Sequence, residues 1–506
     1  MPYNDYLDGN PNMKVALIAL APIERWIQLT GVRILSACLK RAGHDVRIIF
    51  LSGAVLPDHI LGDVAKLVED SDLIGITLMT DDFENAVKVT KSLKNGLGIP
   101  IIWGGVHPTI RPDECIKHAD IVCRGEGESA LLELVRKMGN GEDFTDIQGM
   151  WFKHQGKVIK NKLRPLNKDL DSVPFQDYDM GNHYIFKDKK ICKIERTMLK
   201  DLFTQPFDHP FYMLLSSRGC PFSCTYCWNY WHNKMFVDQP KLRKRSVDNV
   251  IEELVMRKEQ FPFLKSFHFQ DDAFFLRDEM EIKEFAEKYK EKVKMPFWIW
   301  GIHPSEVDGG KLSLLIASGM TVLRMGIQTG ARRMLKLYKR CTPEQIEKAV
   351  KIMRGFKDKI EVYYDLILDN PWEKDEDTTE SLMFLSKLPV PYKLNFFTLK
   401  LYPETDLYWK AKKEGIIKDD LTDVYRKPQQ ERRNIYLNKV HLLLASYVER
   451  GKRIPPIVMF LLTNRKLRNL YLSQLLYLLL SVPRIIRRFR DKDRLTIGTH
   501  LKSLFE

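Results

Sequence analysis

The chain has few cysteines and no apolar run long enough to span a membrane. It has 506 residues and eight cysteines, and the five outside one cluster (Cys38, Cys115, Cys123, Cys192 and Cys341) show no pairing pattern. A disulfide framework is therefore not expected, and a reducing cytoplasm fits. The uncharged apolar stretch 469–483 has 15 residues, fewer than the about 20 that a spanning helix needs. Residues 1–12 are polar and acidic, so we expect no signal peptide.

Positive charge is concentrated at the C-terminal end. The formal net charge is +14, and residues 426–506 hold 18 Lys and Arg against 5 Asp and Glu, so residues 1–425 are nearly neutral. Cations flank two apolar stretches, 454–462 and 469–483. The pattern fits a helix lying in an anionic membrane interface at the inner face, which would favour a lipid or other hydrophobic substrate. It equally fits a helical cap with a solvated basic face. Aromatic interleaving is too sparse to favour nucleic acid.

The first 165 residues alternate between strand-length apolar runs and helical patterns. Strands are expected at 13–20, 46–51, 73–78, 99–105 and 121–128, and helices at 31–42, 60–69 and 83–94. This order predicts a parallel, doubly wound α/β sheet, Rossmann-like in type. Such sheets bind ligands at the carboxyl ends of their strands.

The second half repeats the alternation as six strand–helix units. Strands are expected at 211–215, 266–269, 297–301, 321–327, 360–368 and 393–399, with helices between them. Six such units make a partial (β/α)6 TIM barrel, whose active site lies at the carboxyl ends of the strands. We therefore expect an α/β protein with four parts: a sheet domain at 1–165, a linker at 166–210, a partial barrel at 211–425 and an α-helical extension at 426–506.

Three cysteines follow the first barrel strand with the spacing Cys-x3-Cys-x2-Cys. Cys220, Cys224 and Cys227 can bind three irons of a 4Fe–4S cluster and leave the fourth iron open, whereas electron-transfer clusters usually take four cysteines. A zinc knuckle that borrows His232 is the alternative, with an irregular ligand spacing. Cys-rich motifs for an auxiliary cluster are absent from the sequence.

With its surroundings, the triad resembles the radical S-adenosylmethionine (SAM) superfamily, in which the open iron chelates SAM. The resemblance runs from about residue 14 to 415 and implies an anaerobic, metal-binding enzyme whose catalytic residues include the three cluster cysteines. It also implies a SAM site, for which the matching residues are Tyr226, Asp271, Asp272, Gln328 and Arg340. The family's sixth-strand motif Gly-x-Pro-Gly-Glu departs here, because Asp369 and Trp372 replace both glycines.

The loops after the strands of the first domain resemble those of the cobalamin-binding domain that precedes many radical SAM domains. The resemblance implies cobalamin contacts from the loops after three strands, at Thr77, Met79, Gly104, Gly105, His107, Gly125, Glu126 and Gly127. The first loop, 22–28, contains no histidine for cobalt. Paired glycines also occur in α/β folds without this cofactor.

The resemblance implies a radical SAM enzyme, and a cobalamin-dependent methyltransferase acting on an unactivated carbon is the main hypothesis. Its cofactors would be a 4Fe–4S cluster, SAM and cobalamin, with a low-potential donor such as ferredoxin or flavodoxin. The alternatives are cyclisation, C–C coupling or oxidation without methyl transfer, and a non-catalytic cobalamin sensor. Cys341, Tyr363 and Tyr364 are candidate hydrogen-atom donors or structural residues.

Overall fold

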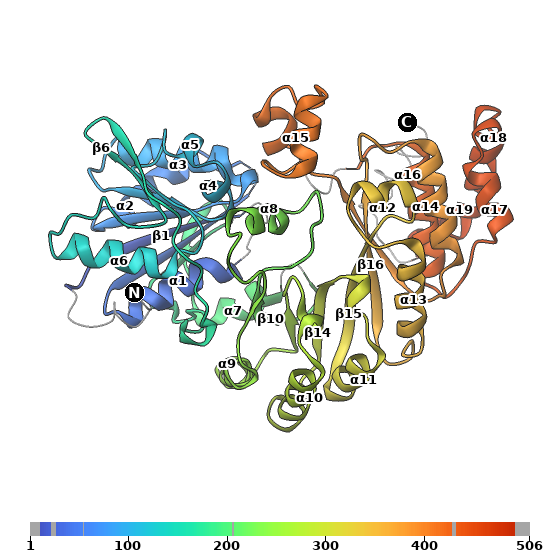
Figure 1. Ribbon diagram of the computed structural model, residues 1–506, viewed down its shortest axis with the longest axis horizontal. Helices are drawn as coiled ribbons and strands as arrows, with labels where there is room; N and C mark the ends of the chain where they lie inside the picture. Colours follow the sequence, from blue (N-terminus) through green and yellow to red (C-terminus); the bar gives the residue numbers. More distant parts are fainter. Residues whose placement is uncertain (1–10, 22–26, 54, 205–206, 428–431, 491–506) are drawn as a thin grey trace.

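Two sheets placed side by side organise the protein (Figure 1). The computed structural model describes residues 11–21, 27–53, 55–204, 207–427 and 432–490, with the side chains of 483–490 excepted. A nine-stranded sheet forms the N-terminal domain, and a six-stranded sheet forms the barrel. In Figure 1 the N-terminal domain is blue to cyan, the barrel is green to yellow, and the C-terminal helices are orange to red.

The first sheet has the predicted parallel centre, with the order β5-β4-β3-β1-β2. Residues 15–21 of β1 are all at most 5% exposed because helices cover both faces of the sheet. The elements are β1 (Lys14–Ala21), α1 (Thr30–Arg41), β2 (Asp45–Ser52), α2 (His59–Val68), β3 (Leu73–Thr77), α3 (Phe83–Lys94), β4 (Ile101–Gly104), α4 (Val106–Ile110), α5 (Pro112–Cys115), β5 (Ile121–Cys123) and α6 (Glu128–Gly139). The doubly wound fold class is confirmed.

Two antiparallel hairpins extend this sheet at its edges. One pairs β6 (Met150–His154) with β7 (Lys157–Lys160), and the other pairs β8 (His183–Lys187) with β9 (Lys190–Lys193). β8 also pairs in parallel with β2, and α7 (Leu199–Thr204) follows. Part of the segment 166–210, expected to be a linker, is therefore an edge of the first sheet.

The second sheet is fully parallel and ordered β10-β13-β14-β15-β16-β17. Helices cover its outer face, as expected for a partial (β/α)6 barrel. The elements of the barrel domain are β10 (Phe211–Leu214), β11 (Ser217–Arg218), α8 (Trp228–Met235), β12 (Arg243–Lys244), α9 (Val247–Gln260), β13 (Ser266–Phe269), α10 (Glu279–Lys288), β14 (Phe297–Ile302), α11 (Gly309–Ser318), β15 (Met320–Gln328), α12 (Arg332–Leu337), α13 (Pro343–Arg354), β16 (Glu361–Leu368), α14 (Asp375–Lys387) and β17 (Lys393–Thr398). Of these, β11 and β12 pair with each other in a separate antiparallel sheet of two strands.

The chain returns to the N-terminal domain after β17. Helix α15 (Asp406–Lys413) lies between the two sheets at the top of Figure 1. Arg111 of the first domain pairs with Glu404 at 3.1 Å and with Asp420 at 2.9 Å. Tyr425 donates a hydrogen bond to Glu114 at 2.6 Å. These contacts tie the two domains together.

The C-terminal helices pack on the barrel beside α14. They are α16 (Tyr436–Val448), α17 (Pro456–Thr463), α18 (Arg465–Asn469) and α19 (Leu472–Arg490). Asp369, which replaces a family glycine, accepts hydrogen bonds from the backbone N–H of Arg433 and from Asn438 Nδ2, both at 2.9 Å. The substituted loop therefore anchors the helical extension. Within the described residues, no helix has the length and apolar character needed to cross a bilayer.

Candidate functional site

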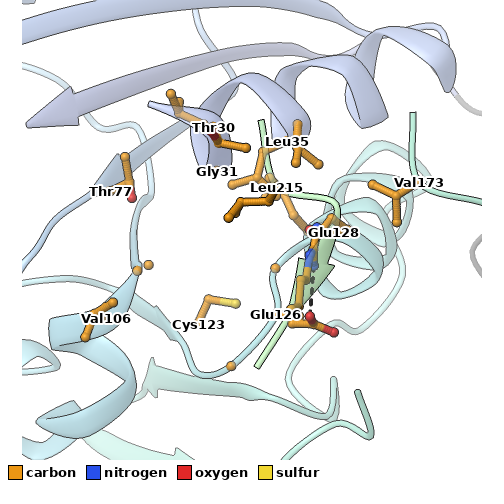
Figure 2. Close-up of a pocket in the computed structure, with 18 of the residues that line it drawn as sticks. Thr30, Gly31, Leu35, Thr77, Val106, Cys123, Glu126, Glu128, Val173 and Leu215 are labelled. Atoms are coloured by element: carbon orange, nitrogen blue, oxygen red, sulfur yellow. Dashed lines mark hydrogen bonds and ion pairs between the residues drawn. The ribbon is translucent and has the colours of Figure 1, made fainter. Parts of the chain in front are cut away.

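A cavity of about 390 Å³ lies between the carboxyl ends of the first sheet and the cysteine loop. Both domains line it. Figure 2 shows Thr77 and Cys123 from the sheet, Val106 from the start of α4, and Thr30 and Leu35 from α1 around its interior. Six of the eight residues predicted at the cobalamin line this cavity: Thr77, Gly104, Gly105, Gly125, Glu126 and Gly127.

Glycine is required where the sheet loops approach the cavity. Gly105 has φ +105°, and a Cβ there would lie 2.7 Å from the Leu78 carbonyl oxygen. Gly31, at the start of α1, behaves differently, because a Cβ there would meet no atom within 4 Å. Gly31 lines the cavity, so the space beside it can hold a ligand.

His107 and Met79 are not among the residues that line the cavity, contrary to their predicted role. His107 is fully buried, and its ring packs against Phe83 at 5.0 Å and Tyr425 at 5.1 Å. Burial lowers its pKa to about 3, so the ring stays neutral. Met79 is 47% exposed in the loop after β3. His107 serves as a core residue beneath the loop. The loop 22–28, which lacks a histidine, lies mostly outside the described residues, because only Ile27 and Gln28 are described.

The cysteine loop leaves the end of β11 through Gly219. This residue has φ +91°, and a Cβ there would collide with the Lys241 carbonyl oxygen. Thr225 fastens the loop to α12, since its N–H and its Oγ1 donate to the carbonyls of Tyr338 (3.2 Å) and Leu337 (2.8 Å). Asn233 Nδ2 donates to the Cys220 carbonyl at 2.7 Å.

The three thiols of the cysteine loop differ in their burial. Cys224 is buried, and Cys220 and Cys227 are half-buried. Among the described residues, no three His, Cys, Asp or Glu side chains converge to hold one metal ion. A cubane offers a separate iron to each thiolate, so its ligands do not have to converge on one point. Burial raises the pKa of both Cys220 and Cys227 to about 12, and iron coordination would deprotonate them.

The two adjacent aspartates after β13 have different environments. Asp271 is 1% exposed and accepts hydrogen bonds from Ser216 N at 3.1 Å, Ser216 Oγ at 2.8 Å and Ser217 Oγ. Asp272 is exposed and lines the cavity, where desolvation by the surrounding protein still raises its pKa. Asp271 therefore holds the strand before the cysteine loop, and Asp272 is the carboxylate available to a ligand.

Separate effects are expected from the two aspartates. Asp271→Asn should lower the free energy of unfolding by about 2 kcal/mol, because charged acceptors contribute about that much. Asp272→Asn should leave stability unchanged and, if Asp272 has the predicted role in the SAM site, weaken SAM binding by about tenfold, because a charge-assisted contact to the SAM ammonium would be lost. Chemical denaturation and equilibrium binding of SAM to the reconstituted protein measure the two effects. Equal SAM affinity of the Asp272→Asn and unmodified proteins would contradict this assignment.

Arg340 and Tyr226 lie beside the buried thiol of Cys224, and Gln328 lies near Gly326 at the end of β15. Arg340 donates from Nη1 to Cys224 Sγ at 3.4 Å and from Nη2 to the Gly326 carbonyl, and its buried Nε has no partner among the described residues. Gln328 has φ +72°, an uncommon value for this residue type. Tyr226 packs edge-on against Tyr338, with ring centroids 5.1 Å apart. A polar ligand beside Cys224 would satisfy Arg340.

An ion-pair network, which we name the interdomain clamp, joins the two domains beside the cavity. It consists of Glu126 from the loop after β5, Glu128 at the start of α6, Arg218 from β11 and Arg243 from β12. Arg218 pairs with Glu126 at 2.8 Å and with Glu128 at 2.7 Å. Arg243 pairs with Glu126 at 2.9 Å. All four side chains are at most 21% exposed. Figure 2 labels both glutamates at the edge of the cavity.

Family models match both halves of this arrangement. Residues 18–135 match the B12 binding domain, and residues 214–384 match the radical SAM superfamily. The chain is a radical SAM superfamily protein with an N-terminal B12-binding domain.

Relatives of this radical SAM protein include methyltransferases and cyclases. An uncharacterized methyltransferase of Pyrococcus horikoshii is 28% identical over 379 residues, which are 74% of this chain and 76% of that protein. An anaerobic magnesium-protoporphyrin IX monomethyl ester cyclase of Rubrivivax gelatinosus is 24% identical over 73% of this chain and 63% of that protein. TsrM of Kitasatospora setae, a radical SAM methyltransferase solved with cobalamin and a 4Fe–4S cluster, has a TM-score of 0.64 at 15% identity. That match covers 80% of this chain and 78% of TsrM and shows a shared fold.

Several residues that line the cavity of this radical SAM protein were not predicted from the sequence. Thr30, Leu35 and Val173 line it, and so do Trp228 and His232 on α8. Val173 lies in the segment expected to be a linker, where no periodic pattern marks it. Arg218 also lines the cavity. It directly precedes Gly219 and Cys220 in the sequence, and this position next to the triad is the feature from which its place at the cavity could have been predicted.

The residues present fit a cobalamin in the cavity. The loops after β3, β4 and β5 supply backbone and small side chains, and Gly31 leaves open space opposite them. Thr77, Gly105 and Gly127 would hold the cofactor on the sheet side.

A larger side chain at Gly31 should fill this space. Gly31→Leu is expected to reduce cobalamin retention by at least about tenfold without unfolding the protein, since a single well-placed clash exceeds 1.4 kcal/mol. Absorbance of the reconstituted protein reports cobalamin content. Gly62→Leu is the matched control, because Gly62 is also helical and has no atom within 4 Å of a Cβ, but lies on α2 away from the cavity lining. Full cobalamin retention by Gly31→Leu would contradict this placement.

Proposed function

We propose that this protein is a cobalamin-dependent radical SAM methyltransferase that acts on an unactivated carbon of a small molecule. The observation that carries the proposal is one cavity lined both by the loops of the B12-binding domain and by the residues around the cysteine triad. A single cavity would hold the groups bound to the two cofactors close together. Such proximity lowers the barrier of a reaction that needs both cofactors.

The chain's own residues bind, orient and enclose the reactants. Cys220, Cys224 and Cys227 would hold the cluster, and Asp272 and Arg340 would hold the ammonium and carboxylate of SAM. When bound, the cluster supplies the electron that cleaves SAM, and cobalamin supplies a methyl group for transfer. The interdomain clamp keeps the two domains at a fixed separation, and the apolar side chains of Leu35, Val173 and Leu215 exclude water.

Cyclisation is the second candidate function, because two relatives named as cyclases match 73% and 69% of this chain. Relatives named as methyltransferases also include two bacteriochlorophyllide enzymes of Chlorobaculum tepidum, at 22% identity. C–C coupling and oxidation would use the same radical without methyl transfer, with cobalamin as a redox aid or absent. A non-catalytic cobalamin sensor would leave the cysteine triad without a role.

Product analysis separates these functions. The anaerobically reconstituted protein, supplied with cobalamin and a strong reductant, is expected to form both 5′-deoxyadenosine and S-adenosylhomocysteine from SAM. Mass spectrometry quantifies both products. Formation of 5′-deoxyadenosine alone would favour cyclisation or oxidation, and formation of neither would favour the sensor.

The electron for the cluster would come from an acidic low-potential donor such as ferredoxin or flavodoxin. The net charge of +14 favours association with an acidic protein. We place the protein in a reducing, oxygen-poor cytoplasm, with a peripheral contact at the inner face of the membrane.

The membrane contact would be made by the outer face of α17 and α19. Leu472, Leu475, Leu478, Leu479 and Val482 are 44–63% exposed and recur at helical spacing on one face of α19. The opposite face packs on the other C-terminal helices, α16, α17 and α18, through the buried Ser473, Tyr477 and Ser481. Ile457, Phe460 and Leu461 add exposed apolar surface on α17. Such a contiguous patch marks an interaction site, and the net positive charge of 426–506 favours anionic lipid.

Vesicle binding tests this contact. The Leu475→Glu/Leu479→Glu double variant is expected to reduce binding to vesicles containing phosphatidylglycerol by at least about tenfold, because it removes two of the apolar side chains that would enter the interface. Flotation of the full-length protein with these vesicles measures binding. Met280→Glu is the matched control, since Met280 is 81% exposed on α10. The proposal would be contradicted if the double variant bound these vesicles as well as the unmodified protein does. It would also be contradicted if the unmodified protein bound neutral phosphatidylcholine vesicles equally well.

A further inference from the structure

The inner face of the barrel carries a charged pair between aromatic rings. Along β15, the neighbours Leu323 and Met325 are fully buried against the helix-side core, so Arg324 points to the opposite, inner face. Arg324 pairs in register with Tyr363 of β16. Asp365 of β16 in turn pairs with Asn395 of β17. These polar residues therefore belong to one patch in the middle of the barrel.

Arg324 is held rigidly on three sides. Its Nε donates to both Asp365 carboxylate oxygens, at 2.7 and 2.8 Å, and Asn395 Nδ2 donates to Asp365 Oδ1 at 3.0 Å. Its guanidinium carbon lies 5.2 Å from the ring centroid of Trp300 and 5.1 Å from that of Phe397. The guanidinium is thus fixed between two aromatic faces.

The outer edge of the guanidinium is left available. Asp365 engages only Nε, and neither Nη1 nor Nη2 has a hydrogen-bond partner among the described residues. The Arg324 side chain is 22% exposed and that of Asp365 is 14% exposed. A pair that served only to join strands would be expected to use the two-pronged Nη edge, which matches a carboxylate best. Here that edge faces accessible space.

This edge lies a short distance below the proposed reaction centre. Gly326, whose carbonyl accepts from Arg340, is two residues further along β15. Two strand residues span about 7 Å. A molecule anchored at Arg324 would therefore extend past the aromatic rings towards Arg340 and Cys224.

We propose that Arg324 anchors the carboxylate of a flat, apolar substrate, with Trp300 and Phe397 packing on its carbon skeleton. This inference rests on the proposed function, because it names the substrate class of the same barrel. Arg324 is a substrate-binding residue that determines specificity. The planar fork binds the two carboxylate oxygens, the rings bind the flat skeleton, and Asp365 with Asn395 keeps the fork oriented.

Binding of naphthoate and its uncharged amide, naphthamide, tests this assignment. Isothermal titration calorimetry is performed without SAM on the full chain, before and after reconstitution with cluster and cobalamin. The unmodified protein should bind naphthoate at least about tenfold more tightly than naphthamide, as expected for a charge-assisted pair. Arg324→Gln should abolish this preference. Arg332→Gln, which changes an exposed arginine paired with Glu344, should retain it.

Two further variants keep the test decisive if Arg324→Gln is unstable. Arg324→Lys retains the charge and should keep part of the preference. Phe397→Leu leaves Arg324 in place and should weaken acid and amide alike, so that their ratio is unchanged. Equal affinity for acid and amide, a preference that survives Arg324→Gln, or no binding of either compound would overturn the proposal. Because no turnover is involved, failure of methyl transfer would not affect the result.

Discussion

Replacing Cys224 with alanine is expected to abolish SAM cleavage. Cys224 is buried at the centre of the triad, 3.4 Å from Arg340 Nη1, and its loss leaves two thiols for a cluster that needs three. Mutation of groups that only support metal ligands lowers metal affinity or activity by up to about 100-fold. Loss of a direct ligand should lower both by at least that factor. Iron content and 5′-deoxyadenosine formation, measured anaerobically after reconstitution, report the effect.

Cys192→Ala provides the matched control. Cys192 is a half-buried free cysteine on the β8–β9 hairpin, outside the cavity. This variant should keep full iron content and full SAM cleavage. If Cys224→Ala protein still formed 5′-deoxyadenosine at the unmodified rate, the cluster assignment would be refuted.

Replacing Glu126 with glutamine should destabilise the junction between the domains. Glu126 is 19% exposed and contacts both Arg218 and Arg243, so its neutralisation leaves buried charge uncompensated. Removing one partner of a buried ion pair costs about 3 kcal/mol or more. Arg218 retains Glu128, which places the expected loss near that lower value. Denaturant unfolding followed by fluorescence measures it.

The clamp also predicts a pH dependence. Burial alone would raise the pKa of Glu126, but Arg218 and Arg243 outweigh it and lower the pKa from 4.5 to about 2. A carboxylate with a lowered folded-state pKa contributes stability above the unfolded value of 4.5, and this contribution is lost as the pH falls towards 2. The difference in stability between unmodified and Glu126→Gln proteins should therefore be constant from pH 6 to 8 and shrink below about 4.5.

An exposed glutamate serves as the control for the clamp. Glu142 pairs with Arg136 at 2.7 Å but is 41% exposed. Glu142→Gln should change the free energy of unfolding far less than Glu126→Gln, because exposed ion pairs contribute little to stability. Equal stability of the Glu126→Gln and Glu142→Gln proteins would show that the clamp does not hold the domains together.

The fold was accessible from sequence because alternation of apolar runs and helical patterns is strong in both domains. Predicted strands such as 73–78 and 393–399 end within a few residues of β3 and β17. The hairpins at 150–193 were not predicted because they form sheet edges, where exposed lysines such as Lys190 and Lys193 interrupt the pattern.

The site was accessible only in part. The glycine loops were identified because parallel strands bring their carboxyl ends to one edge of a sheet. Spacing alone does not distinguish Asp271, which binds Ser216, from Asp272, which lines the cavity. The burial of His107 depends on Tyr425, a residue over 300 positions away, so no local pattern reveals it.

The cluster and cobalamin are expected to occupy opposite sides of one cavity. Electron paramagnetic resonance of the reconstituted protein tests this arrangement most directly. If the arrangement holds, the cobalt signal of the bound cobalamin relaxes faster when the cluster is reduced, and Gly31→Leu protein shows the cluster signal alone. A cobalt signal that is unaffected by cluster reduction would contradict the arrangement.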